Sequence, residues 1–375
     1  MKTIVSALLA SICMASPVLR AQENLLPKEI IVGKERVKTR KEIRLPDIDG
    51  YRLLKCDFHM HTIFSDGIVW PTLRVHEAWE EGLDAIAITE HIEGQPARRG
   101  VEKGNHNYPF EIAGREALLH DILLIRGAEI TRPMPPGHLN ALFLKDINPL
   151  DQKDYMKALE EAHRQGAFIF WNHPGWGVKE IKWYALHDTL YQRGWLHGIE
   201  VYNEFEWYPQ ALNWANEKNL TLMANSDVHD VIERLYDFHT MPFRPMTLVL
   251  SKERTEEGIR EALFARRTIA YFYNTLMGKE EWLEKFFHAS VQIQSPHHTT
   301  ATHRILHIKN TSDIPFLLRK TDTQTQAAQY PDKIDLPAGR SVLLMLPAKP
   351  ETQSVVYEVE NMIIAPERKL HVKIF

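Results

Sequence analysis

Apolar, strand-like runs alternate with helix-like segments over most of residues 55–265, and this alternation limits the folds open to the chain. The expected strands are Lys55–His59, Ala85–Thr89, Ile122–Arg126, His138–Leu144, Ala167–Trp171, Gly198–Tyr202, Leu220–Ala224 and Met246–Leu250. The expected helices are Pro71–Glu81, Pro109–His120, Asp154–Gln165, Lys179–Gln192, Pro209–Lys218 and Thr255–Ala265. Strands that are apolar along their length are typical of a parallel sheet covered by helices, either a barrel or an open sheet.

Polar clusters lie at the ends of these strands. They are His59-Met60-His61-Thr62, Ser65-Asp66-Gly67, Thr89-Glu90-His91, Gly127-Ala128-Glu129, Pro136-Gly137-His138, Asn172-His173-Pro174-Gly175 and Asn225-Ser226-Asp227-Val228-His229. Active sites of such folds gather at the carboxyl ends of the strands. Because so many different strands contribute, we expect a barrel.

The pair His59 and His61 is weak evidence when it stands alone, since two ordinary polar residues at a strand end give the same pattern. In an extended segment, residues two apart point to the same side, so both imidazoles can reach one cation. The later clusters each add His, Asp or Glu, the residue types that bind zinc, manganese or iron. Such groups cannot be buried cheaply without metal or partners. The whole set therefore predicts a metal site.

The pattern changes near Gly278. Residues 286–375 contain alternating runs separated by turn residues, and they predict a small antiparallel β-sandwich. The runs are Ala289–Ile293, Arg304–Lys309, Ser341–Leu346 and Lys369–Ile374.

The N-terminus has the pattern of a cleavable signal peptide over residues 1–21. Lys2 is followed by an apolar segment from Ile4 to Met14, and Ala21-Gln22 is a plausible cleavage site. Residues 22–50 are polar and predict an exposed arm. We therefore expect a periplasmic or secreted protein. No other stretch is long and apolar enough to predict a transmembrane segment.

The net charge of −4 argues against a general nucleic-acid binder, which normally carries a basic surface. It does not argue against a small anionic substrate, because bound cations would supply the local positive field. The sequence leaves the oligomeric state open.

The order H-x-H-T-x-x-S-D-G, T-E-H, G-x-E, G-H, N-H-P-G and S-D-x-H resembles that of the PHP (polymerase and histidinol phosphatase) superfamily over roughly residues 55–230. The export signal and the C-terminal domain are similar to those of bacterial phosphodiesterases of the Sb-PDE type. The resemblance implies a distorted (β/α)7, TIM-like barrel, with the PHP domain at residues 51–278.

The resemblance also implies two to three divalent metal ions, of zinc, manganese or iron. It assigns His59, His61 and Asp227 to one ion. Glu129 bridges that ion to a second one, which His138 and His173 also hold. The third ion is held by Asp66, His91 and His229. Many relatives carry Asp where this chain has Glu90, a position that is not a usual ligand.

The implied reaction is hydrolysis of a small phosphodiester by a metal-bridging hydroxide, since cations lower the pKa of water. Two residues are expected to be catalytic: Glu129 as the bridge between ions, and His229 as a ligand and candidate proton carrier. Arg132 and Arg234 lie near the motif loops and are candidates for binding phosphate oxygens. A solvated surface arginine is the simpler interpretation of both.

Aromatic residues flank the motifs, and the sequence does not decide whether they line a pocket or pack helices against the sheet. They are Trp176, Trp183, Trp207 and Tyr208.

Two other functions remain open on the sequence. One is a phosphomonoesterase of the histidinol-phosphatase type, although the expected export does not fit an intracellular biosynthetic substrate. The other is a non-catalytic metal- or carbohydrate-binding surface protein. A proofreading nuclease is disfavoured because the sequence shows no polymerase domain and no basic groove.

Overall fold

The computed structural model describes residues 38–94, 104–321, 325–349 and 354–375. The expected signal peptide and residues 22–37 of the expected arm lie outside these ranges. The described residues from Arg40 onward belong to one compact unit. Within the described residues, no helix combines the length and the apolar character needed to cross a bilayer.

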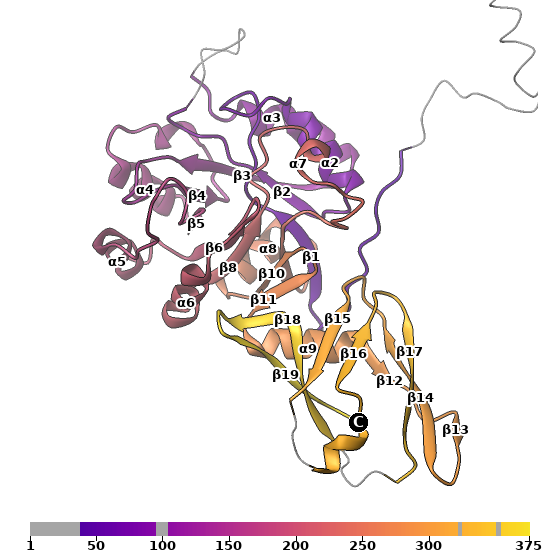
Figure 1. The fold of residues 1–375 in the computed structure, drawn as a ribbon. Coiled ribbons are helices and arrows are strands. Elements are labelled where there is room, and N and C mark those ends of the chain that lie inside the picture. The colour runs from indigo at the N-terminus through magenta and orange to yellow at the C-terminus, as the bar shows by residue number, and fades with distance from the viewer. Residues whose placement is uncertain (1–37, 95–103, 322–324, 350–353) are drawn as a thin grey trace, which may run out of the picture. The chain divides into compact units, whose positions relative to one another are not determined.

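The first part of the chain is a mixed α/β structure (Figure 1). Its strands are β1 (Arg52–Asp57), β2 (Ala85–Ile88), β3 (Leu123–Ile130), β4 (Leu139–Leu142), β5 (Phe168–Trp171), β6 (Gly198–Asn203), β7 (Glu206–Trp207), β8 (Thr221–Asn225), β9 (Met246–Ser251), β10 (Thr268–Phe272) and β11 (Thr275–Gly278). Its helices are α2 (Pro71–Glu80), α3 (Tyr108–Leu119), α4 (Tyr155–Arg164), α5 (Ala185–Gln192), α6 (Pro209–Lys218), α7 (Ile232–Leu235) and α8 (Glu256–Phe264).

Helix formation follows local signals. Pro71 and Pro209 occupy the first turns of α2 and α6, where a missing backbone N–H does no harm. The side chain of Asp154 accepts a hydrogen bond from the backbone N–H of Met156 and so caps α4. The expected helix Lys179–Gln192 is wrong in its first part: only Ala185–Gln192 is helical. Before it, Trp183 packs edge-on against Trp171 instead.

The sheet is rich in parallel pairs but not wholly parallel. β1 pairs in parallel with β2, β2 with β3, β5 with β6, and β6 with β8. The expectation of an all-parallel sheet is wrong at β4, which is antiparallel to β3 and β5, and at β9, which is antiparallel to β1. Only residues 131–138 connect β3 to β4, too few for the crossover that a parallel neighbour requires.

β10 and β11 form a hairpin that extends the sheet beyond β9. Two residues with positive φ, Tyr273 and Asn274, make its turn. Helix α9 (Glu280–Ser290) follows, in a region where the sequence indicated no helix, and the strand expected at Ala289 begins two residues later, at Val291.

The C-terminal part consists of two sheets of mainly antiparallel strands, as the sequence predicts (Figure 1). β12 (Val291–Ile293), β13 (His298–Thr299), β14 (His303–Asn310) and β17 (Ser341–Pro347) form one sheet. β15 (Phe316–Lys320), β16 (Lys333–Leu336), β18 (Val355–Ala365) and β19 (Arg368–Ile374) form the other. β18 also pairs in parallel with β11, so the second sheet is continuous with the α/β sheet.

Three groups of apolar side chains form the core. One group extends from α2 and β2 through α9 into the C-terminal sheets. Another lies between β4–β6 and the helices α4, α5 and α6. A third gathers residues of many strands between them, among them Leu54, Ala87, Phe170, Met223 and Val249. The strands that carry the polar clusters are therefore rigidly held.

Candidate metal centre

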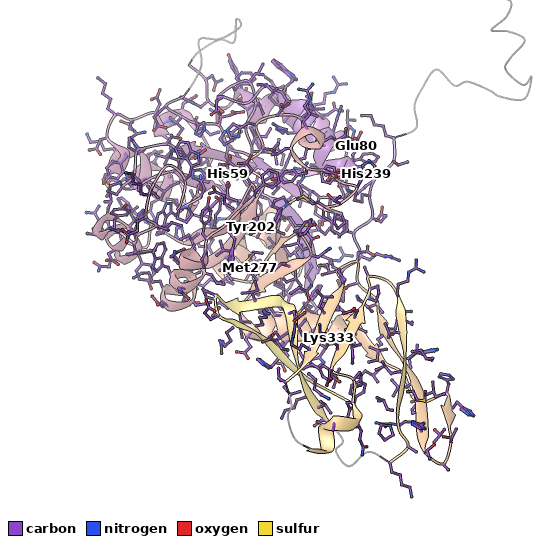
Figure 2. All side chains as sticks on the ribbon, in the orientation of Figure 1. His59, Glu80, Tyr202, His239, Met277 and Lys333 are labelled. Atoms are coloured by element: carbon purple, nitrogen blue, oxygen red, sulfur yellow. The ribbon has the colours of Figure 1, made fainter. Side chains whose placement is uncertain are left out.

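The predicted polar clusters meet at one edge of the sheet. His59, His91, His173 and Asp227 follow the carboxyl ends of β1, β2, β5 and β8, and Glu129 lies near the end of β3. His138 instead precedes β4. Since β4 is antiparallel to its neighbours, the start of β4 lies at the same edge as their ends. Figure 2 labels His59 within the α/β part.

Backbone hydrogen bonds fix the loops that carry the ligands. The N–H of Asp227 donates to the carbonyl of His59 at 2.9 Å, and the N–H of His61 donates to that of Val228 at 3.0 Å. Asp227 and His173 have φ of +50° and +24°, a backbone conformation that non-glycine residues rarely adopt. Such strain persists where the surroundings determine the conformation, and it is common at functional sites.

Four side-chain atoms of the first predicted set converge. Nε2 of His59 lies 3.3 Å from Oε2 of Glu129 and 3.1 Å from Oδ1 of Asp227. Nε2 of His61 lies 3.2 Å and 3.1 Å from the same two oxygens. Ligand atoms about 2.0 Å from a tetrahedral zinc ion are themselves about 3.3 Å apart. The spacing thus fits a single small cation between them.

The second oxygen of Glu129 faces other imidazoles. Its Oε1 lies 2.7 Å from Nδ1 of His138 and 3.6 Å from Nε2 of His173. His173 also lies 3.7 Å from Oδ2 of Asp227. The two oxygens of one fully buried carboxylate therefore face two different groups of nitrogen atoms.

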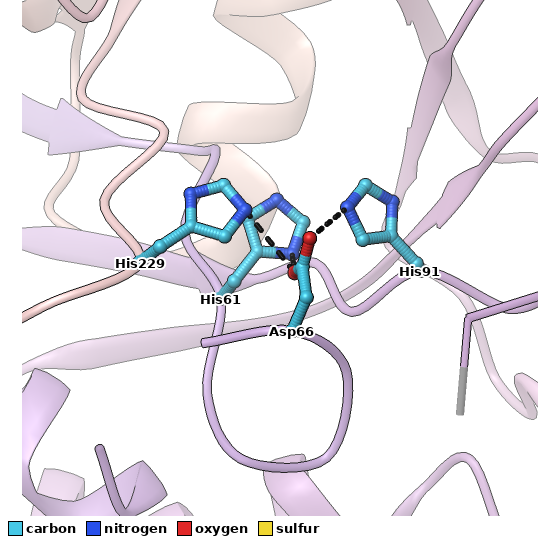
Figure 3. Close-up of side chains that lie close together, drawn as sticks. All are labelled: His61, Asp66, His91 and His229. Atoms are coloured by element: carbon cyan, nitrogen blue, oxygen red, sulfur yellow. Dashed lines mark ion pairs between the residues drawn. The ribbon is translucent and has the colours of Figure 1, made fainter. Parts of the chain in front are cut away.

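The third predicted set is centred on Asp66, as Figure 3 shows. Oδ1 of Asp66 lies 3.1 Å from Nε2 of His229, and Oδ2 lies 3.4 Å from Nε2 of His91. His61 stacks between the two histidines, with ring centroids 4.4 Å from His91 and 4.3 Å from His229. The structure thus brings together all the residues that the sequence predicts as ligands, and their roles remain predictions.

Unpartnered atoms show that these residues fit a metal. Among the described residues, the buried atoms Nε2 of His61, Oδ1 of Asp227, Oε1 of Glu129 and Nδ1 of His138 have no hydrogen-bond partner. Each imidazole nitrogen among them lies close to a carboxylate oxygen, and each carboxylate oxygen lies close to an imidazole nitrogen, but none is aligned for a hydrogen bond. Leaving such an atom unsatisfied costs about 1–3 kcal/mol. Cations that accept lone pairs from several of these atoms at once would remove that cost.

The carboxylates and imidazoles of the cluster shift one another's pKa values. Burial alone would lower the pKa of His91, but the carboxylates of Glu129 and Asp66 outweigh it and raise that pKa to about 10. Burial opposes ionisation of Glu129, yet the nearby imidazoles hold its pKa well below the usual range. The pKa of Asp227 is lowered in the same way, mainly by His59 and His61. The carboxylates stay ionised, and cation binding would displace protons from the imidazoles.

Sequence reasoning missed Glu200, which lies in β6 and is fully buried. Its Oε1 lies 2.9 Å from Nδ1 of His59 and accepts a hydrogen bond from Asn225. Its Oε2 accepts from the backbone N–H of His173 at 2.7 Å and from Asn203 at 2.8 Å. A carboxylate behind a metal-binding histidine fixes its tautomer and orientation. In the sequence, the sign of such a role for Glu200 is that it is a single carboxylate inside an otherwise apolar strand.

Two further buried residues position the loops. Glu90 accepts hydrogen bonds from the backbone and hydroxyl of Thr62 and from the hydroxyl of Ser65, which explains its place in the motif without metal binding. Arg74 on α2 donates to the carbonyls of His61 and Val228 at 2.9 and 3.0 Å and pairs with Glu77 at 2.7 Å. Arg74 therefore ties together the two loops that carry ligands.

A cavity of about 370 Å³ opens over the cluster, and its lining includes Asp66, His91, His138, His173, Asp227 and His229. The two predicted phosphate-binding arginines lie differently. Arg132 lines a neighbouring cavity, forms an ion pair with Glu93 and donates to two backbone carbonyls. Arg234 lies on α7, pairs with Asp230 at 3.3 Å, is 69% exposed and lines neither cavity. The structure therefore does not bring Arg234 to the site.

Of the four flanking aromatic residues, one lines the cavities and three do not. Trp176 lines both cavities. Trp183 packs among Trp171, His187 and Trp214. Tyr208 is buried and donates to Glu206, while Trp207 is partly exposed on β7.

Buried histidines and carboxylates that converge at the strand ends of an α/β sheet define the centre of a metal-dependent hydrolase. Comparison with known proteins narrows this class. A solved structure from Bacteroides vulgatus, described as a two-domain protein containing a predicted PHP-like metal-dependent phosphoesterase, is 45% identical. The match covers 90% of this chain and 99% of that chain, with a TM-score of 0.85.

Two further comparisons each cover a part of the chain. Residues 291–375 match a family model described as an Ig-like domain. The uncharacterized protein MJ1295 of Methanocaldococcus jannaschii is 27% identical over 190 residues, which are 47% of this chain and 82% of that protein.

The likeness to the Bacteroides protein extends over almost all of both chains, and it shows the family. This chain belongs to the PHP-like metal-dependent phosphoesterases. The prediction of PHP membership is confirmed, while the narrower resemblance to the Sb-PDE type remains a prediction.

Proposed function

We propose that this phosphoesterase hydrolyses small phosphodiesters with two to three divalent ions of zinc, manganese or iron. The observation that carries the proposal is the position of Glu129. Its Oε2 faces His59 and His61, and its Oε1 faces His138. A fully buried carboxylate with both oxygens turned toward separate imidazole groups suits a bridge between two cations.

The proposed ligands follow the three groups of contacts. His59, His61 and Asp227 hold one ion together with Glu129, and Glu129, His138 and His173 hold a second. Asp66, His91 and His229 hold the third. When bound, the ions lower the pKa of water so that a hydroxide nucleophile forms at neutral pH, and they balance the charge of phosphate oxygens.

The chain's own residues orient the reaction. Glu200 holds the proton of His59 at Nδ1, which leaves Nε2 facing Asp227 and Glu129. His229 is the most exposed of the cluster's imidazoles, with 38% of its side chain accessible in the open cavity. We propose His229 as a ligand that also exchanges protons with solvent at the mouth of the site.

We propose a diester rather than a monoester because the lining side chains add little positive charge to that of the ions. A phosphomonoester carries up to two negative charges at neutral pH, whereas a diester carries one. Among the described residues that line the two cavities, Arg132 is the one lysine or arginine, and its guanidinium is paired with Glu93. The site thus offers little side-chain charge for a second negative charge on the substrate.

Rates on two chromogenic substrates test the proposal. Manganese- or zinc-loaded protein is expected to cleave bis-p-nitrophenyl phosphate with a higher kcat/KM than p-nitrophenyl phosphate, and a chelator is expected to abolish both rates. His59→Ala and Asp227→Ala should lose bound metal as well as rate, whereas His239→Ala, an exposed histidine in another loop, should retain both.

Other outcomes would favour the alternatives. A higher kcat/KM on the monoester would support a phosphomonoesterase of the histidinol-phosphatase type. Metal binding without hydrolysis of either ester would support a non-catalytic metal- or carbohydrate-binding protein. Activity that survives the chelator would refute the metal mechanism.

We also propose that the sheet closes into a barrel between β8 and β9. Thr247 on β9 accepts from the backbone N–H of Ala224 at 3.0 Å and donates to its carbonyl at 2.9 Å. Thr268 on β10 donates to the carbonyl of Leu222 at 2.8 Å. The apolar group that includes Met223 of β8 and Val249 of β9 lies where the interior of such a barrel would be. These contacts support closure by side chains.

Export through the N-terminal signal remains a proposal based on the sequence. Fractionation of expressing cells is expected to recover the protein, without its first residues, outside the cytoplasm. Full-length protein in the cytoplasmic fraction would contradict it.

A further inference from the structure

A second cavity of about 490 Å³ adjoins the cavity over the metal centre. The two share Thr131, His138, His173 and Trp176 in their linings. A group bound in the second cavity would therefore lie next to a phosphate held at the cluster. Its volume falls within the range of small-molecule sites.

Trp176 stands at the border of the two cavities. Its ring centroid lies 5.2 Å from that of His138 and 5.8 Å from that of His173. Although it contacts two site residues, Trp176 is 61% exposed. A large apolar ring left open at a site gains free energy when a second apolar surface covers it.

The loop that carries Trp176 is held tightly. The backbone N–H of Trp176 donates to the carbonyl of His173 at 2.9 Å. Gly175 packs so closely on the buried ring of Tyr208 that a Cβ there would lie 2.6 Å from Cε1 of that ring. The indole is thus presented by a fixed backbone, so no backbone ordering is needed when a ligand stacks on it.

The rest of the second cavity is mostly apolar. Met134, Pro133 and Val178 contribute to its wall. The guanidinium of Arg132 is already engaged by Glu93 and by the carbonyls of Thr131 and Gln152. The cavity therefore favours an uncharged group.

We infer that this cavity binds the organic group of the phosphoester, and that this group is a flat, uncharged aromatic ring stacked on Trp176. The inference rests on the proposed function, because it places the phosphate at the metal cluster. The ring could belong to an aryl ester or to a nucleobase, which share this chemistry. Trp176 is then the residue that selects the substrate.

Binding of phosphonates, which are not hydrolysed, tests the inference. Calorimetry on manganese-loaded protein compares phenylphosphonate with methylphosphonate, which has the same charged group without the ring. The wild type is expected to bind phenylphosphonate about threefold to tenfold more tightly, a typical gain for aromatic stacking. Trp176→Ala should abolish this preference, while Trp176→Phe should retain part of it.

Trp282→Ala is the matched control, because Trp282 lies on α9 and contacts Tyr51 rather than the site. It should keep the full preference. The inference would be overturned if the wild type bound methylphosphonate as tightly as phenylphosphonate, or if the preference for phenylphosphonate survived Trp176→Ala. Either result would leave the proposed function standing. Binding of neither phosphonate to the manganese-loaded wild type would overturn the inference, and only an accompanying failure to hydrolyse bis-p-nitrophenyl phosphate would overturn the proposed function.

A nucleoside 5′-phosphonate separates the two sources of the ring. Tighter binding than phenylphosphonate, lost in Trp176→Ala, would support the inference with a nucleobase as the ring. Weaker binding would support it with an aryl ester.

Discussion

Glu200→Gln tests whether the carboxylate behind the histidines controls metal binding. The change keeps the size of the side chain and removes its charge. All four partners of Glu200 are donors: His59 Nδ1, the backbone N–H of His173, and the amides of Asn203 and Asn225. A glutamine amide must turn its NH2 group toward one pair of them.

Both orientations of the glutamine weaken the site. If the NH2 group faces His59, the imidazole must carry its proton on Nε2, which then cannot bind a cation. If it faces His173, it meets a backbone N–H that cannot become an acceptor. Loss of such a partner typically weakens metal binding tenfold to a hundredfold, about 1.4–2.7 kcal/mol.

The assay is a titration of chelator-stripped protein with zinc in competition with a chromogenic chelator. Glu200→Gln is expected to show the weakened affinity, while Glu217→Gln, an exposed carboxylate on α6, is expected to match the wild type. Equal zinc affinity in Glu200→Gln and the wild type, with both folded by circular dichroism, would refute the role assigned to Glu200.

Two further predictions concern stability. Arg74→Met removes the partner of buried Glu77 and the donor to two ligand loops, so urea unfolding should show that the free energy of unfolding falls by about 3–5 kcal/mol. Arg115→Met, on the exposed face of α3, should change it little, and an equal loss in both variants would count against the role of Arg74. Burial lowers the pKa of His187 to about 4, so protonation favours the unfolded chain, and stability should fall as pH drops below the ordinary histidine pKa. From pH 7 to pH 5 this group accounts for about 2 kcal/mol, and His187→Phe should flatten the pH dependence of urea unfolding by that amount; an unchanged slope would contradict the reasoning.

The strand-end pattern allowed most of the site to be predicted from the sequence. Residues that end parallel strands share one edge, so the sequence alone predicts that His59, His91 and Asp227 lie together. His138 was expected at the same edge for the wrong reason. It lies there because β4 runs antiparallel, which the short connection after β3 indicates.

The parts that could not be predicted depend on long-range packing. Arg74 looks like any charged residue of an amphipathic helix, and only the tertiary structure brings it under the loops of His61 and Val228. Arg234 shows the converse. It follows a motif closely in the sequence, yet α7 directs it to solvent beside Asp230. Proximity along the chain therefore does not show which basic side chains face a site.

The pairing of β18 with β11 has a consequence for the Ig-like part of the chain. Met362 and Ile363 lie in register with Leu276 and Met277, so β18 covers the strand at which the α/β sheet would otherwise end. An uncovered strand of this kind offers free N–H and carbonyl groups to other chains. A truncated chain without β18 would expose the edge of β11, and we expect it to aggregate more readily than the full chain.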